Sequence, residues 1–313
     1  MVESSVSFAA LTASANRTKR RICLRGGLSG AQRVAKCAGS KQGKRAMSDA
    51  EYHGHPAFSA SLAKLIVQRS PLHAWTASRS LNPDFAEEYK DEYDLGTVCH
   101  SLVLEGDESK LVVVEAADWR TKIAKEAREE ARSAGKTAIL AKKMPQVRAA
   151  VKACHAAIEN SELKGLFRGA VIEKPVMWQE GEIACRCKPD LLHREFSVVL
   201  DLKTTTNAEP TAFIRQITGY GYDVQADFYL RGTKAKHFIF LAVETEPPYA
   251  TSLVALGPQM LEIASKKVDF ALSIWDACTR SGKWSGYSNQ IHYAEPNPWE
   301  MEKWLEGLEY HEA

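Results

Sequence analysis

The stretch of sequence that decides the fold begins at Lys188-Pro189-Asp190 and ends at Asp201-Leu202-Lys203. Asp201 and Lys203 follow the apolar run Val198-Val199-Leu200. Because they are two residues apart in a predicted strand, both side chains point to one face. Asp190 stands before the turn that leads into this strand and can reach the same place across the turn. Two carboxylates that converge repel each other and need a cation, and their hard oxygen atoms favour Mg²⁺ or Mn²⁺.

Lys203 distinguishes this pattern from a simple metal cage. A lysine beside two carboxylates is useful where a phosphate or an anionic nucleophile must be held, and the backbone carbonyl of Leu202 can add another oxygen ligand. An Asp-x-Lys pair in a strand is usually a surface ion pair, but this pair ends a buried strand, where functional sites gather in α/β folds. The residues alone leave two interpretations open, a phosphodiester-cleaving site and an ordinary ion pair.

Apolar periodicity on both sides of this stretch predicts a mixed α/β domain. Helices are predicted from Ser59 or Ser61 to Ser70-Pro71, after Leu95-Gly96-Thr97, and over residues 119–133, 144–158, 210–217, 222–231 and 259–279. Strands are predicted over residues 171–178, 182–193, 197–203, 237–244 and 250–255. The order of these elements indicates a helical N-terminal part followed by a mixed sheet with helices around it.

Residues 1–47 differ from the rest of the chain. Residues 1–46 contain ten Lys or Arg and one acidic residue, a charge of +9; since the whole chain has +2, residues 47–313 carry −7. The segment is interpreted as a basic, disordered tail. An upstream extension of the reading frame before Met47, a DNA-binding arm and an organelle transit peptide are alternatives. Residues 48–313 are predicted to form one domain, with a helical part (58–167), a catalytic sheet core (168–280) and an aromatic C-terminal segment (281–313).

The composition also argues against several protein classes. No run of about 18 apolar residues occurs, so no transmembrane helix is expected, and no Walker A motif occurs, so ATP is not expected as a cofactor. The seven cysteines are scattered and odd in number, which is typical of reduced thiols in a cytoplasmic protein. Cys185 and Cys187 are interpreted as packing residues rather than metal ligands. The same interpretation, packing rather than DNA stacking, is given to Trp284, Tyr287, Trp299 and Trp304.

Several segments resemble the PD-(D/E)xK nucleases, and most closely their RecE-like branch, the nuclease domain of exonuclease VIII. Pro189-Asp190 and Asp201-Leu202-Lys203 match the signature of the superfamily. The likeness extends in the same order to residues 96–105, 119–122, 172–173, 187–192 and the Q-x-x-x-Y pattern within 222–229. The resemblance implies a restriction-endonuclease-like core, with a mixed central sheet flanked by helices.

The resemblance also implies a metal centre. His100, Asp190 and Asp201 would be ligands of Mg²⁺, which Mn²⁺ would replace, and the Leu202 carbonyl would join them. A lone histidine in an apolar helix is more often a packed core residue, but the family pattern makes His100 an exception. Lys203 would orient the attacking water or stabilise the charged transition state.

Three further residues would support this centre. Glu173 would bind the metal through water or position Lys203, with a surface acid at a strand edge as its alternative. Gln225 and Tyr229 are four residues apart on one helical face. They would hold the DNA phosphate or the site lysine, although ordinary helix packing is an alternative for Tyr229.

The function implied by the resemblance is 5′-to-3′ digestion of linear double-stranded DNA by a phage-type exonuclease. The product would be a 3′ single strand for recombination or repair, passed to a single-strand annealing protein. A ring-like homo-oligomer in the cytoplasm of a bacterial or phage-infected cell is expected, with no membrane partner. No iron–sulfur cluster is expected, because no cysteine follows Cys278. The alternatives are a DNA-binding module without catalysis and an endonuclease of the same fold; the intact carboxylate–lysine set argues against the first.

Overall fold

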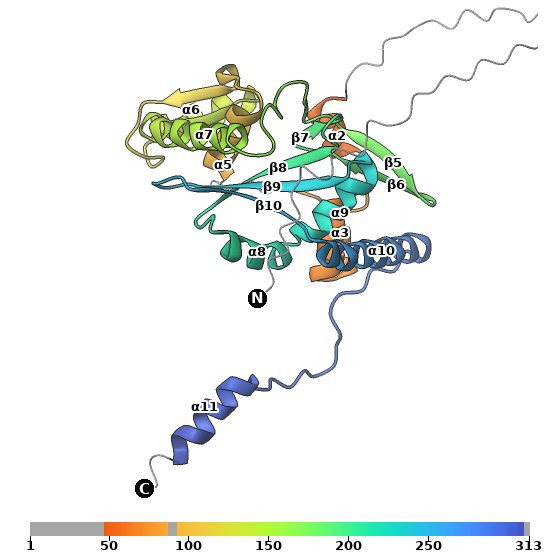
Figure 1. Cartoon of the computed structure of the whole chain (residues 1–313). Helices are drawn as coiled ribbons and strands as arrows, with labels where there is room; N and C mark the ends of the chain where they lie inside the picture. The colour runs from red at the N-terminus through yellow and green to blue at the C-terminus, as the bar shows by residue number, and fades with distance from the viewer. Residues whose placement is uncertain (1–46, 87–92, 310–313) are drawn as a thin grey trace, which may run out of the picture.

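A computed structural model of the chain describes residues 47–86 and 93–309 (Figure 1). The predicted basic tail, residues 1–47, lies outside these ranges except for Met47. Within the described ranges, no helix combines the length and the apolar character that crossing a lipid bilayer requires. The structure is a mixed α/β fold, as the sequence predicts.

The centre of the molecule is a five-stranded sheet in the order β10-β9-β8-β7-β4. Its strands are β4 (Val171–Ile172), β7 (Leu191–His193), β8 (Val198–Thr205), β9 (His237–Glu244) and β10 (Thr251–Ala255). β8 runs parallel to β9, and the other neighbouring pairs are antiparallel, so the sheet is mixed. Residues 198–202 of β8 and 238–243 of β9 are buried, because both faces of the sheet are covered there, and Asp201 is the charged residue within this buried part of β8.

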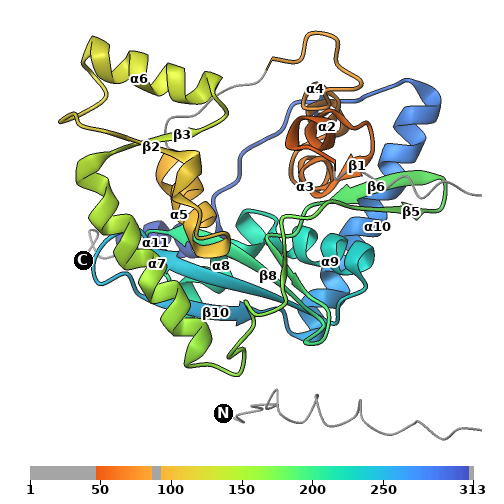
Figure 2. The same ribbon diagram turned by 90° about the horizontal axis from the view of Figure 1, so that it is seen from above.

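Helices cover both faces of this sheet (Figures 1 and 2). They are α5 (Tyr93–Leu104), α7 (Met144–Glu159), α8 (Pro210–Gly219) and α9 (Tyr222–Thr233). Leu200 and Leu202 share an apolar cluster with residues of α5 and α7, whereas Val199 packs with residues of α8 and α9. Because side chains alternate along a strand, Asp201 and Lys203 project on the same face as Val199, toward α9.

A second, three-stranded sheet has the order β1-β6-β5, with β1 (Phe58–Ser59), β5 (Val176–Glu180) and β6 (Ile183–Cys187). Around it lie α2 (Asp49–Gly54), α3 (Ala60–Gln68), α4 (Pro71–Thr76) and α10 (Pro258–Ser281). Phe58, Phe228 and Trp275 form the centre of the apolar cluster that joins these elements. Cys185 and Cys187 are fully buried in β6, in agreement with their interpretation as packing residues.

A small separate layer is formed by β2 (Leu111–Val114), β3 (Thr137–Leu140) and α6 (Lys122–Ser133), with the short 3₁₀ turns η2 (Glu108–Lys110) and η3 (Ala141–Lys143) beside it. β2 and β3 are parallel neighbours, and α6 connects them. The sequence predicts the charged helix but not the two strands, so the N-terminal part is less purely helical than expected. Arg128 lies over the ring of Trp119, 4.7 Å from its centroid, which anchors α6 to this layer.

The predicted strands 171–178 and 182–193 are each broken in two. β4 and β7 pair in the five-stranded sheet, whereas β5 and β6 pair in the three-stranded sheet. The first break falls at Glu173, whose φ of 46° is unusual for a residue with a side chain. The second falls at Lys188-Pro189-Asp190, where the proline supplies no N–H to continue the ladder. The two strands predicted over 171–178 and 182–193 therefore each contribute one part to the five-stranded sheet and one part to the three-stranded sheet, and the two sheets diverge at the breaks.

Two helix boundaries also differ from the prediction. α3 ends at Gln68, but Ser70-Pro71 starts another helix, because the Ser70 hydroxyl accepts a hydrogen bond from the N–H of His73 and Pro71 is the first residue of α4. α5 begins at Tyr93, so Gly96 lies within the helix rather than before it. The absence of a Cβ there lets α5 approach β8, since a Cβ on Gly96 would lie 3.1 Å from Thr204 Oγ1.

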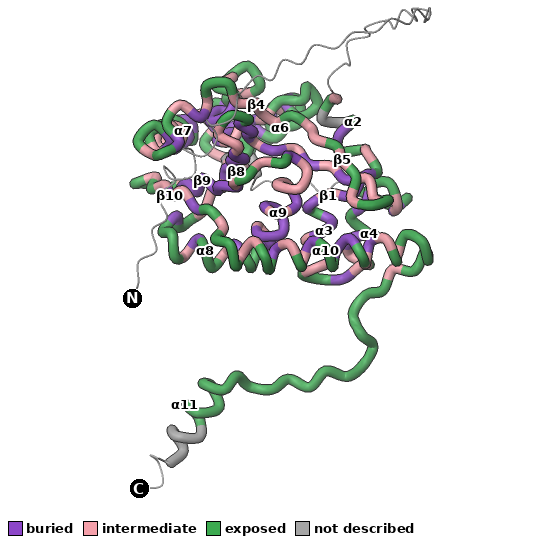
Figure 3. The backbone as a smooth tube through the Cα atoms, turned by 45° about the vertical axis from the view of Figure 1, so that its right-hand side comes forward, coloured by how far each residue is buried: buried purple, intermediate pink, exposed green. Residues whose placement is uncertain are grey.

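The C-terminal aromatics divide into two groups. Trp284 packs on Trp275 with ring centroids 5.2 Å apart, as predicted. Trp299 and Trp304 belong to α11 (Pro298–Glu309), a helix that the sequence did not predict, and their side chains are 62% and 69% exposed. Figures 1 and 3 show α11 apart from the sheets at the end of an exposed segment. The packing interpretation is therefore wrong for these two tryptophans.

Candidate active site

The candidate site lies where the two sheets diverge. The N–H of Glu173 donates to the carbonyl of Asp190 at 3.1 Å, so the two strand breaks lie side by side. β7 pairs with β8 only from Leu191 onward, which leaves the edge of β8 without a backbone partner beside Asp190. The Asp190 side chain takes this place, and its Oδ2 accepts the N–H of Leu202 at 2.8 Å. The strand break thus fixes the first carboxylate.

Leu202 also presents its carbonyl at this open edge. In a β-strand the N–H and the C=O of one residue point to the same side. The N–H of Leu202 is directed at Asp190, so the carbonyl of Leu202 faces the side that β7 has left. The predicted backbone ligand is consequently in a position to join the carboxylates.

Asp201 and Lys203 meet on one face of β8, as their spacing predicts. Asp201 is 1% exposed, and its Oδ2 lies 2.5 Å from Lys203 Nζ. Its other oxygen, Oδ1, accepts a hydrogen bond of 2.6 Å from Gln225 Nε2 on α9. Gln225 therefore contacts the carboxylate of Asp201, and its predicted contact with the DNA phosphate stays a prediction.

His100 reaches the same place from α5. Its Nε2 lies 3.0 Å from Asp190 Oδ2, and its Nδ1 lies 3.3 Å from Glu173 Oε1. The close approach of α5 at Gly96 brings this ring to the edge of β8. The histidine predicted from a distant segment is thus joined directly to the Asp190 side of the site.

Glu173 takes part through partners that were not predicted. It follows β4 directly, and its Oε2 accepts a hydrogen bond of 2.9 Å from Lys188 Nζ. It contacts His100 and Lys188 rather than Lys203, so the predicted role of positioning Lys203 has no contact to support it. Lys188 stands two residues before Asp190, and the sequence pattern indicates no role for it.

Burial and charge set different proton affinities for the two aspartates. Burial raises the pKa of Asp201 to about 6, assisted by the negative charge of Asp190 and opposed by Lys203. Burial also disfavours the charged form of Asp190, but the hydrogen bond from His100, with the charges of His100 and Lys203, outweighs it and lowers the pKa of Asp190.

The two basic groups respond in the opposite sense. Burial tends to lower the pKa of Lys203, but the carboxylates of Asp201 and Asp190 outweigh it and raise the pKa. Likewise, burial opposes protonation of His100, and Asp190 and Glu173 raise its pKa nevertheless. In both cases the neighbouring carboxylates favour the protonated form of the basic group.

One face of α9 follows the site from end to end. Tyr222 lies beneath Lys203 Nζ, which is 4.9 Å from the ring centroid. Gln225 holds Asp201 one turn later, and Tyr229 lines a neighbouring pocket one turn further on. Tyr229 has no contact with Lys203 among those described. Gln225 therefore contacts the carboxylate of Asp201, whereas Tyr229 lines the neighbouring pocket.

The donor set fits a divalent metal ion. Asp190, Asp201 and the Leu202 carbonyl supply hard oxygen atoms, and His100 supplies a nitrogen. Within the described ranges no three His, Cys, Asp or Glu side chains are arranged as a ready-made cage, because His100 and Lys203 are paired with the carboxylates. Asp201 Oδ2 is buried and accepts no hydrogen bond, so this oxygen is available to a cation beside its ion pair with Lys203.

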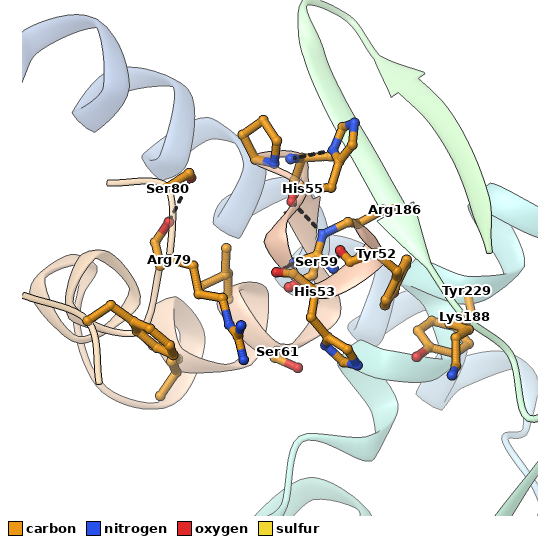
Figure 4. Close-up of a pocket in the computed structure, with 17 residues that line it drawn as sticks. Tyr52, His53, His55, Ser59, Ser61, Arg79, Ser80, Arg186, Lys188 and Tyr229 are labelled. Atoms are coloured by element: carbon orange, nitrogen blue, oxygen red, sulfur yellow. Dashed lines mark hydrogen bonds between the residues drawn. The ribbon is translucent and has the colours of Figure 1, made fainter. Parts of the chain in front are cut away.

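A pocket of about 390 Å³ adjoins this centre (Figure 4). Its lining includes the basic residues Arg79, Arg186 and Lys188 and the hydroxyls of Ser59 and Ser61. Figure 4 shows Lys188 beside Tyr229 at one edge of the pocket. Lys188 links the two places, because it lines the pocket and its Nζ donates to Glu173 Oε2 at 2.9 Å.

Arg186, which lines this pocket, also holds neighbouring elements of the fold together. Its guanidinium donates to the carbonyls of Tyr52 and Ala57 at 2.5 and 3.1 Å and lies over the Tyr52 ring. It thereby fastens α2 and β1 to β6. This pocket was not predicted from the sequence, although the alternation in Cys185–Arg186–Cys187–Lys188 places Arg186 and Lys188 on the face opposite the buried cysteines.

Comparison with known proteins supports the same fold. The family model described as "PDDEXK-like domain of unknown function (DUF3799)" matches residues 59–297. No curated protein matches the chain in sequence. A candidate exonuclease from Eubacterium rectale has a similar crystal structure, with a TM-score of 0.52, 12% identity, and coverage of 80% of this chain and 93% of that one.

Two other solved structures match less well. A phage-related exonuclease from Haemophilus somnus 129PT has a TM-score of 0.28 and 15% identity, covering 59% of this chain and 95% of that one. An alkaline exonuclease (LHK-Exo) from Laribacter hongkongensis has a TM-score of 0.28 and 13% identity, covering 62% and 98%. TM-scores this low carry no argument about this chain. The likeness to the Eubacterium rectale protein, at 12% identity, shows a similar fold. From the match over residues 59–297 and this fold, the chain belongs to the PDDEXK-like DUF3799 family, within the PD-(D/E)xK nuclease superfamily.

Proposed function

We propose that this chain is a metal-dependent DNA exonuclease whose active site contains Asp190, Asp201, Lys203 and His100. The observation that carries the proposal is the meeting of a buried carboxylate, Asp201, a half-buried one, Asp190, and a lysine at the open edge of β8. Family and fold support a nuclease in general terms. In that setting the convergence of Asp190, Asp201 and Lys203 from two chain segments favours an active site over an ordinary structural ion pair.

The proposed metal is Mg²⁺, with Mn²⁺ as a substitute. Asp190, Asp201, His100 and the Leu202 carbonyl would hold it. When bound, it would supply Lewis-acid stabilisation of charge at the phosphate and a more acidic water. Gln225 would keep Asp201 oriented for this purpose, since an oriented ligand binds a metal more tightly than a free one.

Lys203 would act on the phosphate itself. Its ammonium is fixed between Asp201 and the Tyr222 ring, and the carboxylates keep it protonated. A cation that is already in place stabilises negative charge that develops on phosphate oxygens without further reorganisation. Glu173 and Lys188 would maintain the position of His100 from the other side.

The neighbouring pocket would receive the DNA strand. Arg79, Lys188 and the hydroxyls of Ser59, which precedes α3, and Ser61, which lies in it, are groups that bind phosphate oxygens. The rest of the described body has an excess of acidic residues, so a local basic lining is needed to bring the polyanion to the carboxylates. The pocket and the metal centre together would hold one strand over the residues that cut it.

Direction and biological role complete the proposal. We expect 5′-to-3′ digestion of linear double-stranded DNA, leaving 3′ overhangs for recombination or repair. The partners would be DNA ends, a single-strand annealing protein and further copies of the chain in a ring. These points rest on the resemblance of the sequence to RecE-like exonucleases.

The first test compares linear and closed circular duplexes in Mg²⁺. We expect a linear duplex labelled at its 5′ ends to release the label as mononucleotides early in digestion, and a covalently closed circle to stay intact. An exonuclease needs an end to enter the pocket, which the circle does not offer. Early release from a 3′ label would reverse the proposed direction. Linearisation of the circle would identify an endonuclease, and binding of the linear duplex without any cutting would identify a DNA-binding module.

A further inference from the structure

A second lysine shares the aromatic ring that supports Lys203. Lys64 on α3 has its Nζ 5.7 Å from the centroid of the Tyr222 ring, and Lys203 Nζ is 4.9 Å from the same centroid. Both distances are within the reach of a cation–π interaction. Two ammonium groups from different elements are thus gathered on one tyrosine at the edge of the candidate site.

The fold fixes Lys64 in this place. Gly221 has a φ of +65°, and a Cβ there would lie 2.9 Å from Cγ and Cδ of Lys64, so the lysine stem lies against bare backbone. One turn further along α3, Gln68 Nε2 donates to the carbonyls of Thr218 and Gly219 at 3.2 and 3.0 Å. α3 is thereby docked on the corner between α8 and α9, and the aliphatic stem of Lys64 is held while its charged end remains at the ring.

The arrangement gathers positive charge without a matching carboxylate for Lys64. None of the ion pairs found across the described ranges includes Lys64, whereas Lys203 is paired with Asp201. Burial lowers the pKa of Lys64, the charge of Lys203 lowers it further, and Asp201 acts in the opposite direction. The two ammonium groups repel each other in the free protein, and anions bound beside them would relieve the repulsion.

We infer that Lys64 is a DNA-binding residue, which binds a phosphate of the cleaved strand next to the phosphate that Lys203 faces. The inference rests on the proposed function, since it takes DNA as the anion. Lys64 has no described contact with Asp190, Asp201 or His100, so its part is to hold the strand rather than to assist hydrolysis. A purely structural alternative is that the stem only fills the space against Gly221.

Three variants separate these possibilities. Lys64→Met keeps an unbranched stem of similar length and removes the charge, and Lys64→Arg restores the charge. Lys266→Met is the matched control, because Lys266 lies on α10, away from Tyr222, in an exposed ion pair with Glu262 at 2.8 Å. Thermal unfolding of each variant checks that the fold is intact.

The decisive measurement is the salt dependence of binding to a linear duplex in EDTA, where cutting is not expected. For Lys64→Met we expect binding several-fold weaker than wild type at about 0.1 M salt, and a slope of log K against log[salt] reduced by about 0.9. Lys64→Arg should regain most of this slope, and Lys266→Met should match wild type. In Mg²⁺, the KM of Lys64→Met should rise more than its kcat falls.

Each outcome bears on a different claim. If wild type digests DNA and a folded Lys64→Met variant has the wild-type slope and affinity, the inference about Lys64 is wrong and the proposed function stands. If wild type binds duplex ends without cutting them in Mg²⁺, the proposed function fails, while the loss of slope still identifies Lys64 as a phosphate contact. If wild type does not bind DNA, both are wrong.

Discussion

Removal of divalent metal with EDTA is expected to stop DNA digestion by this chain, with a rate loss of at least about 10³-fold. Without a metal ion, Asp190 and Asp201 are paired with His100 and Lys203. A phosphate that approached these carboxylates would then meet negative charge, and the water would keep its ordinary acidity. A metal contribution of several kcal/mol corresponds to a loss of this size, since about 1.4 kcal/mol is one factor of ten.

The measurement uses an end-labelled linear duplex in Mg²⁺, in EDTA, and in EDTA followed by excess Mg²⁺ or Mn²⁺. The label should be released in the first and third samples and retained in the second. Recovery in the third sample is the control, because it separates loss of the metal from loss of the fold. Equal digestion in all three samples would contradict a metal-dependent mechanism.

The substitution Asp201→Asn is expected to reduce cleavage by about 10³-fold or more while DNA-end binding persists. Asparagine has the shape of aspartate, and its carbonyl oxygen can still accept the hydrogen bond that Gln225 donates to Asp201 Oδ1. The substitution removes the negative charge that would bind the metal. It also frees Lys203 from its ion pair, which favours binding of the phosphate rather than opposing it.

Asp276→Asn is the matched control. Asp276 pairs with Arg280 on the exposed side of α10, four residues away, and such pairs contribute little to stability. We expect this variant to digest DNA at the wild-type rate. Single-turnover digestion and binding in EDTA would be measured for both variants, with thermal unfolding as the check on folding. A folded Asp201→Asn variant that cuts at the wild-type rate would remove Asp201 from the active site.

The central part of the site was predictable because it depends on short-range geometry. Asp201 and Lys203 share a face through the two-residue period of a strand, and Asp190 lies across one turn from them. Both placements can be predicted without knowing how the rest of the chain folds. His100 was found through the family pattern, and no spacing along the chain indicates that a helix some 90 residues upstream meets the edge of β8.

The partners of the site residues were not predictable in the same way. Gln225 was correctly placed near the site, but its contact with Asp201 depends on the angle at which α9 crosses β8. Lys64 had a weak signal, since it is a charged residue within the apolar run of α3. The lysine becomes interpretable only when Gly221 and Tyr222 are seen against it.

The fold was predicted at the level of its elements and not of their connections. Alternation in 171–193 indicates strands, but it does not show that they divide between two sheets at Glu173 and Pro189. The four-residue strands β2 and β3 are too short for a clear period and gain their stability by pairing with each other across α6. α4 was missed because Ser70-Pro71 was interpreted as the end of one helix, whereas the same two residues cap and begin the next.

The most direct test of the metal centre is the anomalous scattering of a crystal soaked in Mn²⁺. We predict a strong anomalous peak between Asp190, Asp201 and His100, within coordination distance of the Leu202 carbonyl, with Lys203 Nζ displaced from Asp201. The Asp201→Asn crystal, soaked in the same way, should show a much weaker peak. An intact site with no peak, or a Mn²⁺ ion bound only elsewhere, would contradict the assignment of Asp190, Asp201 and His100 as the metal ligands.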